Sequence, residues 1–216
     1  MMRAVMIVIA VSSWFGLILQ LSLLIAEARA TGMLVALVIF NYFSFFTILT
    51  NVLVAVGLTC TLWMSNSRPG RFFTNATVQS ASAVYIVIVG AVYALALRHL
   101  WNPQGLQKIA DVVLHELVPL LYGAYWLVFV ARRSLAWKSV LPWLLYPLAY
   151  LIFVTIRGAI SGWYPYPFIN AGALGYARAT LNAFGLFIVF IAVGLIAVAF
   201  SRWMGRNYSR EIQPAE

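Results

Sequence analysis

The sequence predicts an all-α, polytopic integral membrane protein built as a six-transmembrane-helix bundle. Hydrophobic residues make up 64% of its 216 positions, and charged residues make up only 9%. Several of its apolar runs exceed the roughly 18 residues that mark a transmembrane helix. A soluble domain of this length cannot bury so much apolar surface, whereas a bilayer solvates it. We therefore expect one integral-membrane domain over residues 1–216, without a separate soluble domain.

Short polar connections, several with Gly or Pro, separate the apolar runs. The expected spans cover residues 4–25, 33–64, 78–97, 111–131, 141–162 and 176–204, and a short cytoplasmic tail follows at 205–216. The second and sixth runs exceed the roughly 20 residues needed to cross hydrocarbon, so part of each is expected to tilt or to lie in the interface. The first run also resembles a signal peptide that ends at "AEARA". Its core is longer than the about 7–15 residues typical of such a signal, which favours a retained span.

The distribution of basic residues indicates the orientation. The 14 Lys and Arg residues divide unequally between the two sides, and the positive-inside rule places both termini in the cytoplasm. The net charge of +9 is scattered over short loops, so we expect no nucleic-acid partner. The cytoplasmic set is Arg3, Arg68, Arg71, Arg132, Arg133, Lys138, Arg202, Arg206 and Arg210, and the other set is Arg29, Arg98, Lys108, Arg157 and Arg178.

A polar stripe runs through the second apolar run. In "NYFSFFTILTN", Asn41, Ser44, Thr47 and Asn51 share one face at helical spacing. Such a stripe is typical of hydrogen bonding between neighbouring transmembrane helices. It also fits half of an active site, and the pattern alone leaves both interpretations open.

Ionisable side chains inside the fourth span are candidates for a functional site, because they are costly in a membrane. Asp111 and His115 lie one turn apart on one face, and Tyr122 continues that face. Asp111 also fits a helix cap at the start of the span. If the second span begins near Asn41, Thr47 lies about 9 Å and His115 about 6 Å below the outer surface. The match weakens if that span begins at residue 33.

Two arginines lie near the expected outer ends of the fifth and sixth spans. Arg157 stands about one and a half turns from the end of its span, and Arg178 lies one turn before Asn182. Both arginines could extend to lipid headgroups. Both could equally bind a substrate carboxylate.

No metal or cofactor is expected. Asp111 and His115 have a spacing that suits two metal ligands, but a third ligand would have to come from elsewhere. The other histidine, His99, and the single cysteine, Cys60, lie in other spans. The sequence contains neither a Gly-rich phosphate loop nor a GxSxG motif.

Three motifs resemble a known family. "FFTILTN", "LHELVP" and "SGWYPYPF" are similar to motifs of the androgen-induced-gene and androgen-dependent tissue-factor-pathway-inhibitor-regulator family, especially its short bacterial branch. The eukaryotic members are integral-membrane threonine hydrolases of fatty acid esters of hydroxy fatty acids. The resemblance implies that Thr47 is the nucleophile and His115 the catalytic histidine, with Thr50 as the competitor. It also implies a bacterial inner-membrane location. The acidic Asp111 and Glu116 depart from the eukaryotic pattern.

This chemistry is coherent. A histidine can take the proton of a threonine hydroxyl as that hydroxyl attacks an ester carbonyl. Asp111 would orient the ring or act electrostatically. The sequence does not choose among the side chains available to stabilise the oxyanion, which are Asn51, Tyr122, Arg157 and Asn182.

Three functions follow from these features. The leading hypothesis is a hydrolase of lipid or fatty-acid esters, surrounded by membrane lipids. The alternative is a non-catalytic lipid-binding or signalling membrane protein. A small transporter ranks last, because the sequence shows no inverted repeat and no paired broken helices. The sequence does not indicate an oligomeric state.

Overall fold

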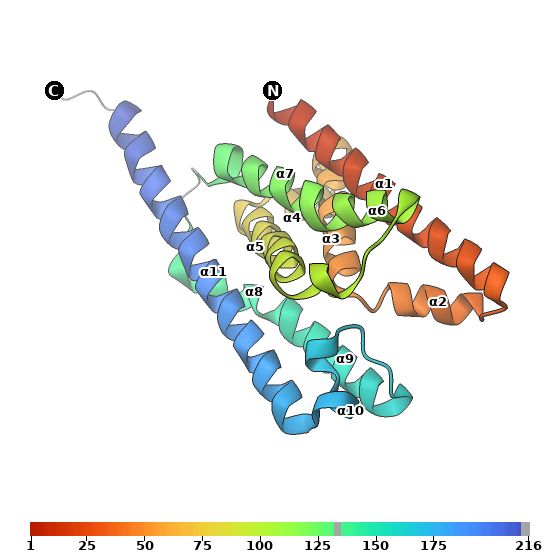
Figure 1. The fold of residues 1–216 in the computed structure, drawn as a ribbon. Coiled ribbons are helices and arrows are strands. Elements are labelled where there is room, and N and C mark those ends of the chain that lie inside the picture. Colours follow the sequence, from red (N-terminus) through yellow and green to blue (C-terminus); the bar gives the residue numbers. More distant parts are fainter. Residues whose placement is uncertain (132–134, 213–216) are drawn as a thin grey trace.

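The computed structural model describes residues 1–131 and 135–212 (Figure 1). All regular structure in these two ranges is helical. Within them, six helical segments are long and apolar enough to cross a membrane, so the predicted all-α, multi-pass bundle is confirmed. The segments are Met2–Thr31, Phe46–Trp63, Ala76–Leu100, Gly105–Val130, Trp137–Ser161 and Tyr176–Arg206. Arg132, Arg133 and tail residues 213–216, which the sequence interpretation used, lie outside the described residues.

The second apolar run is divided, which corrects the expected span over 33–64. A short helix, α2 (Val35–Tyr42), ends before α3 (Phe46–Trp63) begins, and Phe45 between them is extended with φ −86° and ψ 131°. Tertiary contacts hold the break: the Tyr42 hydroxyl donates to the Leu17 carbonyl over 2.8 Å, and the Phe45 ring packs edge-on against Tyr166. The expected four-residue stripe is therefore interrupted, and only Thr47 and Asn51 remain on one helix.

The first helix, α1 (Met2–Thr31), packs along α3 and against the helices that follow Gly105. Gly16 makes this approach close, because a Cβ there would lie 2.8 Å from Val113 Cγ1 and 2.9 Å from Leu114 Cδ2. A side chain at position 16 would push α1 away from the segment that carries His115.

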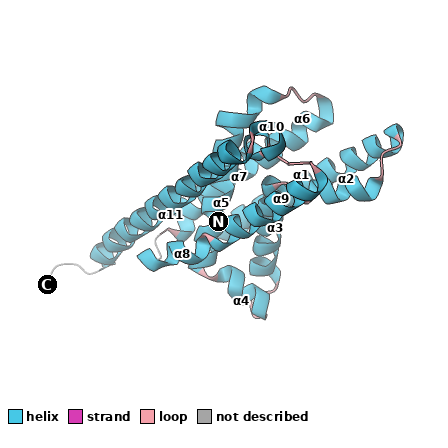
Figure 2. Ribbon diagram, turned by 90° about the horizontal axis from the view of Figure 1, so that it is seen from below, coloured by secondary structure: helices cyan, strands magenta, loops and turns pink. Residues whose placement is uncertain are grey.

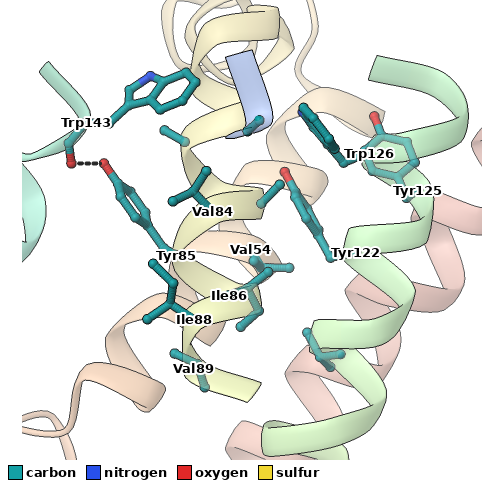
Figure 3. Packing of buried hydrophobic residues seen from close by; sticks show 14 of the residues in the cluster. Val54, Val84, Tyr85, Ile86, Ile88, Val89, Tyr122, Tyr125, Trp126 and Trp143 are labelled. Atoms are coloured by element: carbon teal, nitrogen blue, oxygen red, sulfur yellow. Dashed lines mark hydrogen bonds between the residues drawn. The ribbon is translucent and has the colours of Figure 1, made fainter. Parts of the chain in front are cut away.

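The centre of the core is α5 (Ala76–Val92), which lies between α3 and α7 (Val118–Tyr125). Figure 3 shows its apolar side chains packed among aromatic rings. The Tyr85 hydroxyl donates to the Trp143 carbonyl over 2.5 Å, and the Trp126 indole donates to Ser80 over 2.7 Å. The largely apolar helix is thus fixed to two neighbours by polar contacts.

Three π-helical turns interrupt the helices near the middle of the chain. They are η1 (Tyr93–Leu97) after α5, η3 (Val113–Leu117) after α6 (Gly105–Val112), and η4 (Trp126–Val130) after α7. Wide turns of this kind occur preferentially at functional sites. Two of them carry residues of the site described below, Tyr93 and His115.

The remaining elements complete the bundle. The chain ends in one long helix, α11 (Tyr176–Ile212), which lies beside α5 and α8 (Figure 2). The start of α1 and the end of α11 lie at one end of the molecule, and the α1–α2 and α9–α10 connections lie at the other (Figure 1). The smaller elements are α4 (Arg68–Thr74), η2 (Arg98–Leu100), η5 (Trp137–Ser139), α8 (Val140–Trp143), α9 (Leu145–Ser161), η6 (Pro167–Ile169) and α10 (Ala171–Leu174).

Candidate active site

A cavity of about 450 Å³ lies at the end of the bundle away from both termini. Its wall comes from α1, the α2–α3 break, η1, the α6–η3 segment and the loop that precedes η6. Thr47 and His115 both line it. Two residues that are far apart in the sequence, and that the motifs single out separately, therefore face the same space.

Thr47 is the second residue of α3 and only 7% exposed. Backbone N–H groups in the first turn of a helix have no partner within the helix. The Thr47 N–H donates instead to the Tyr166 hydroxyl oxygen over 3.2 Å, and the two hydroxyl oxygens of Thr47 and Tyr166 lie 3.4 Å apart. Burial raises the pKa of the Tyr166 hydroxyl, against a smaller opposing effect of its bonds to Thr47. Tyr166 therefore keeps its proton at neutral pH and can donate it to a hydrogen bond.

Asn51 connects the two halves of the site. Its amide Nδ2 donates to the Thr47 carbonyl over 2.9 Å and to the Leu114 carbonyl over 3.1 Å. The first bond spans one turn of α3, and the second crosses to the residue before His115. The side chain is fully buried. Asn51 thus sets the position of Thr47 relative to His115, and its amide protons are already used.

Asp111 pairs directly with His115. The ring Nδ1 lies 3.0 Å from Asp111 Oδ1 and 3.0 Å from the Asp111 carbonyl oxygen. The carbonyl oxygen can only accept, so its hydrogen bond assigns a proton to Nδ1 and leaves the Nε2 lone pair free in the neutral ring. Asp111 is 4% exposed and lies inside the span Gly105–Val130. The helix-cap interpretation is therefore wrong, because α6 begins at Gly105.

Tyr93 completes this cluster. Its hydroxyl donates to Asp111 Oδ2, while its ring stacks on the His115 ring with centroids 4.1 Å apart and planes 17° apart. Asp111 Oδ2 thus accepts from Tyr93, while Oδ1 lies at ion-pair distance from His115 Nδ1 without a hydrogen bond. The cluster is a buried relay of hydroxyl, carboxylate and imidazole that opens into the cavity at the imidazole.

The Thr47 hydroxyl and the His115 ring make no direct hydrogen bond within the described part of the chain. A bridging water or the substrate would have to complete the path between them, which is common before substrate binds. Thr50, the competing nucleophile, faces elsewhere: its hydroxyl lies 3.3 Å from the Tyr146 hydroxyl, and it does not line the cavity. Thr47, and not Thr50, therefore shares the cavity with His115.

Four further residues singled out in the sequence line neither this cavity nor the slot described below. The Tyr122 hydroxyl lies 3.5 Å from the Gln79 carbonyl in the core (Figure 3). Asn182 donates to the Phe168 carbonyl over 2.8 Å, and Arg178 is exposed. Arg157 is the fourth. None of the expected oxyanion donors therefore has a free proton at the cavity.

Arg157 is buried away from the reacting groups. It is 7% exposed, and its guanidinium carbon lies 4.0 Å from the Trp163 ring centre and 4.6 Å from that of Phe40. One of its nitrogens donates to Asn41 Oδ1. Arg157 therefore neither extends to the lipid headgroups nor lies beside Thr47.

A second, narrow cavity of about 80 Å³ meets the first one. It is an apolar slot between α3, α5, α9 and α11, with walls that include Phe46, Ile88, Leu151 and Phe190. Thr47, Leu97 and Tyr166 line both spaces. The Thr47 hydroxyl thus stands at the junction of an apolar slot and a wider, partly polar cavity.

Sequence reasoning missed Tyr93, Tyr166 and the polar wall of the cavity. Tyr166 belongs to the quoted "SGWYPYPF" motif, so its place beside Thr47 could have been suspected. Tyr93 sits in an apolar run without any polar pattern, and nothing in the sequence distinguishes it. Glu27 and Gln107 fall in expected connections and Gln20 falls within the first expected span, so the sequence does not bring the three together.

Metal ligands do not cluster in this site. Among the described residues, no group of three or more His, Cys, Asp or Glu side chains is close enough to hold an ion. Cys60 is buried in α3 as a free thiol.

None of the protein-family models, curated proteins or solved structures compared with this chain matches it.

Proposed function

We propose that the protein is a membrane-embedded hydrolase of lipid carboxylic esters, with Thr47 as the nucleophile and His115 as its general base. One observation carries the proposal: Thr47 and the Asp111-paired His115 line one cavity, and Thr47 also borders an apolar slot. A nucleophile, a base oriented by a third group, and an adjacent apolar site for an acyl chain are the parts that ester hydrolysis requires.

The reaction would proceed in two steps. His115 Nε2 takes the proton of the Thr47 hydroxyl as its oxygen attacks the ester carbonyl, and the collapse of the tetrahedral intermediate expels the alcohol, which receives that proton. A water molecule, deprotonated by His115, then attacks the acyl-threonine ester. Its collapse releases the fatty acid and returns the proton to Thr47.

The neighbouring groups have defined parts in this scheme. Asp111 orients the imidazole and stabilises its protonated form through Nδ1. The protonated Tyr166 hydroxyl, which contacts Thr47, is the donor closest to the developing oxyanion. Asn51 holds the Thr47 turn against the segment before His115.

The proposal includes the orientation and the resemblance. With both termini in the cytoplasm, as the basic residues indicate, the cavity opens on the opposite face of a bacterial inner membrane. Similarity to the androgen-induced-gene family of threonine hydrolases supports the assignment of Thr47 and His115. It does not fix the substrate, because unrelated activities share folds and sites.

Labelling by a fluorophosphonate probe tests the nucleophile. The purified full-length protein in lipid nanodiscs should be labelled, and Thr47→Ala should abolish labelling together with turnover of lipid esters. Thr50→Ala is the matched control, because Thr50 lies one turn away on α3 but faces Tyr146. Its labelling should persist. Undiminished labelling of Thr47→Ala would show that Thr47 is not the nucleophile.

A non-catalytic lipid-binding protein is the second candidate. The absence of a direct Thr47–His115 hydrogen bond in the described structure favours it. This alternative predicts that the purified protein retains lipid but turns over none of a panel of esters. It also predicts that Thr47→Ala leaves lipid binding unchanged.

A further inference from the structure

The polar wall of the larger cavity has one sign of charge. Besides Asp111 and His115, its polar side chains include Gln20 and Glu27 of α1 and Gln107 of α6. None of the described residues that line the cavity is Lys or Arg. The cavity therefore presents two carboxylates and two amides, and no permanent cation, to whatever part of a substrate enters it.

Arg98 and Arg157 are both directed away from the cavity. Arg98 forms an ion pair with Glu116 on the outside of the bundle, and its guanidinium carbon stays 5.7 Å from the Tyr93 ring centre. Arg157 lies among Phe40, Trp163 and Asn41. Neither arginine lines the cavity, so neither offers the bidentate fork with which Arg normally binds a carboxylate.

The amide pair is suited to hydroxyl groups. Gln107 Nε2 donates to Gln20 Oε1 over 2.7 Å. This bond leaves the Gln20 amide protons and the Gln107 carbonyl oxygen available, so the pair can both donate and accept. Alcohol hydroxyls need both kinds of partner, whereas a carboxylate needs donors only.

The two spaces divide an ester at its carbonyl. The apolar slot on one side of Thr47 supplies the apolar contacts that an acyl chain needs, and the wider cavity with the amides and Glu27 then receives the alcohol part. We propose that the alcohol part of the preferred substrate is an uncharged, hydroxyl-bearing group, as in an acylglycerol, and that the site discriminates against alcohols carrying a free carboxylate. This inference rests on the proposed function. It differs from the substrates of the eukaryotic family that the motifs resemble, which carry such a carboxylate.

A matched pair of esters tests the charge discrimination. The oleoyl ester of 12-hydroxystearic acid and its methyl ester differ only in the free carboxylate, and 1-oleoylglycerol serves as the uncharged polyol. In nanodiscs at neutral pH, kcat/KM for the methyl ester should exceed that for the free acid by about tenfold, because the substrate carboxylate would lie near two like charges, the buried Asp111 and the exposed Glu27. 1-Oleoylglycerol should be hydrolysed at least as well as the methyl ester.

The two esters also differ in how they partition into lipid, but this difference is the same for every variant of the protein. Variants at Glu27 therefore isolate the effect of the protein on the ratio of the two kcat/KM values. Glu27→Gln should narrow the methyl-ester to free-acid ratio several-fold, and Glu27→Lys should narrow it further. Glu27→Asp keeps the charge and should keep the ratio. Equal ratios in wild type, Glu27→Gln and Glu27→Lys would overturn the inference, and so would a wild type that prefers the free acid.

Non-hydrolysable ether analogues of the two esters distinguish failure of the inference from failure of the proposed function. The analogue of the methyl ester should bind more tightly than the analogue of the free acid, measured by tryptophan fluorescence. Trp101, which lines the cavity, makes this readout suitable. If no ester is turned over but this preference holds, the hydrolase proposal fails and the charge discrimination stands. Equal binding of the two ethers overturns the discrimination itself.

Discussion

Tyr93 lies flat against His115, with ring centroids 4.1 Å apart, while its hydroxyl binds the same carboxylate that pairs with the imidazole. The His115 ring is thus fixed by a stack on one face and by Asp111 at Nδ1. A histidine held in this way has its tautomer set by the bond at one nitrogen, which leaves the other nitrogen free for proton transfer. The relationship between these two rings therefore bears directly on how His115 can act.

Replacing Tyr93 by Phe should keep the stack and remove the hydroxyl that donates to Asp111. We expect kcat for ester hydrolysis to fall about tenfold with little change in KM, because the base is less well oriented and the substrate contacts are unchanged. Tyr122→Phe is the matched control: Tyr122 is a buried tyrosine that lines neither cavity, and its loss should leave kcat unaltered. Equal kcat values for Tyr93→Phe and wild type would contradict the relay.

Asp111→Asn should have a larger effect than Tyr93→Phe. An amide in place of the carboxylate removes the negative charge beside Nδ1 that would stabilise the imidazolium formed when His115 takes a proton. We expect kcat to fall by about 10²–10⁴-fold while the protein stays folded. Circular dichroism and thermal unfolding in detergent verify the fold. A kcat within a factor of two of wild type would show that the Asp111 carboxylate does not stabilise the protonated His115 ring.

Asn51→Ala should destabilise the bundle as well as disable the site. Asn51 donates to two carbonyls from a fully buried position, and its loss leaves the Leu114 carbonyl without that partner. The expected cost is about 2 kcal/mol in the free energy of unfolding, measured by denaturant titration in micelles. Asn182→Ala, which removes one bond from an exposed side chain, should cost about 0.5 kcal/mol or less. Similar costs for the two variants would argue against the bridging role.

The sequence predicted those parts of the fold and site that depend on hydrophobic length and helical period. Six apolar runs are enough to predict the bundle, because the bilayer dictates how long each helix must be. The i,i+4 spacing of Asp111 and His115 placed them on one face, and the structure brings them into contact. Thr47 and His115 were paired by estimated depth and by resemblance, and they line one cavity.

Other features depend on contacts between distant segments, which periodicity does not reveal. The break between α2 and α3 forms where Tyr42 bonds to α1 and Phe45 packs on Tyr166, although the local sequence contains no Gly or Pro that would predict it. Tyr166 reaches Thr47 from a loop more than a hundred residues away. Arg157 appeared available to a substrate, but aromatic rings cover it.

Gly158→Ala should disturb the loop that carries Tyr166. A Cβ at position 158 would lie 2.0 Å from Tyr164 Cε1, so the Tyr164 ring and the adjoining backbone must shift. We expect a loss of about 1–3 kcal/mol in the free energy of unfolding, as for other overpacked positions. Ester turnover should decrease as well. Gly185→Ala is the control, because no atom lies within 4 Å of a Cβ there. A Gly158→Ala protein with wild-type stability would show that the loop can shift to accommodate the Cβ without a cost in the free energy of unfolding.

Alkaline unfolding should depend on Tyr166. Burial raises the pKa of its hydroxyl above the ordinary value of about 10. Between that ordinary pKa and the raised one, the folded state binds a proton that the unfolded state has lost, so the free energy of unfolding decreases as pH rises. One such group contributes a slope of up to about 1.4 kcal/mol per pH unit.

The stability that Tyr166 contributes through this proton is thus complete below pH about 10 and is lost above it. Tyr166→Phe cannot ionise and should unfold with a shallower dependence on pH in this alkaline range. Tyr42→Phe should act in the same direction, because burial also raises the pKa of Tyr42. Denaturant titrations in micelles at a series of pH values above 9 measure the slope. If Tyr166→Phe follows the wild-type slope throughout, burial does not raise the pKa of the Tyr166 hydroxyl in the folded protein, and the buried position of this hydroxyl beside Thr47 loses its support.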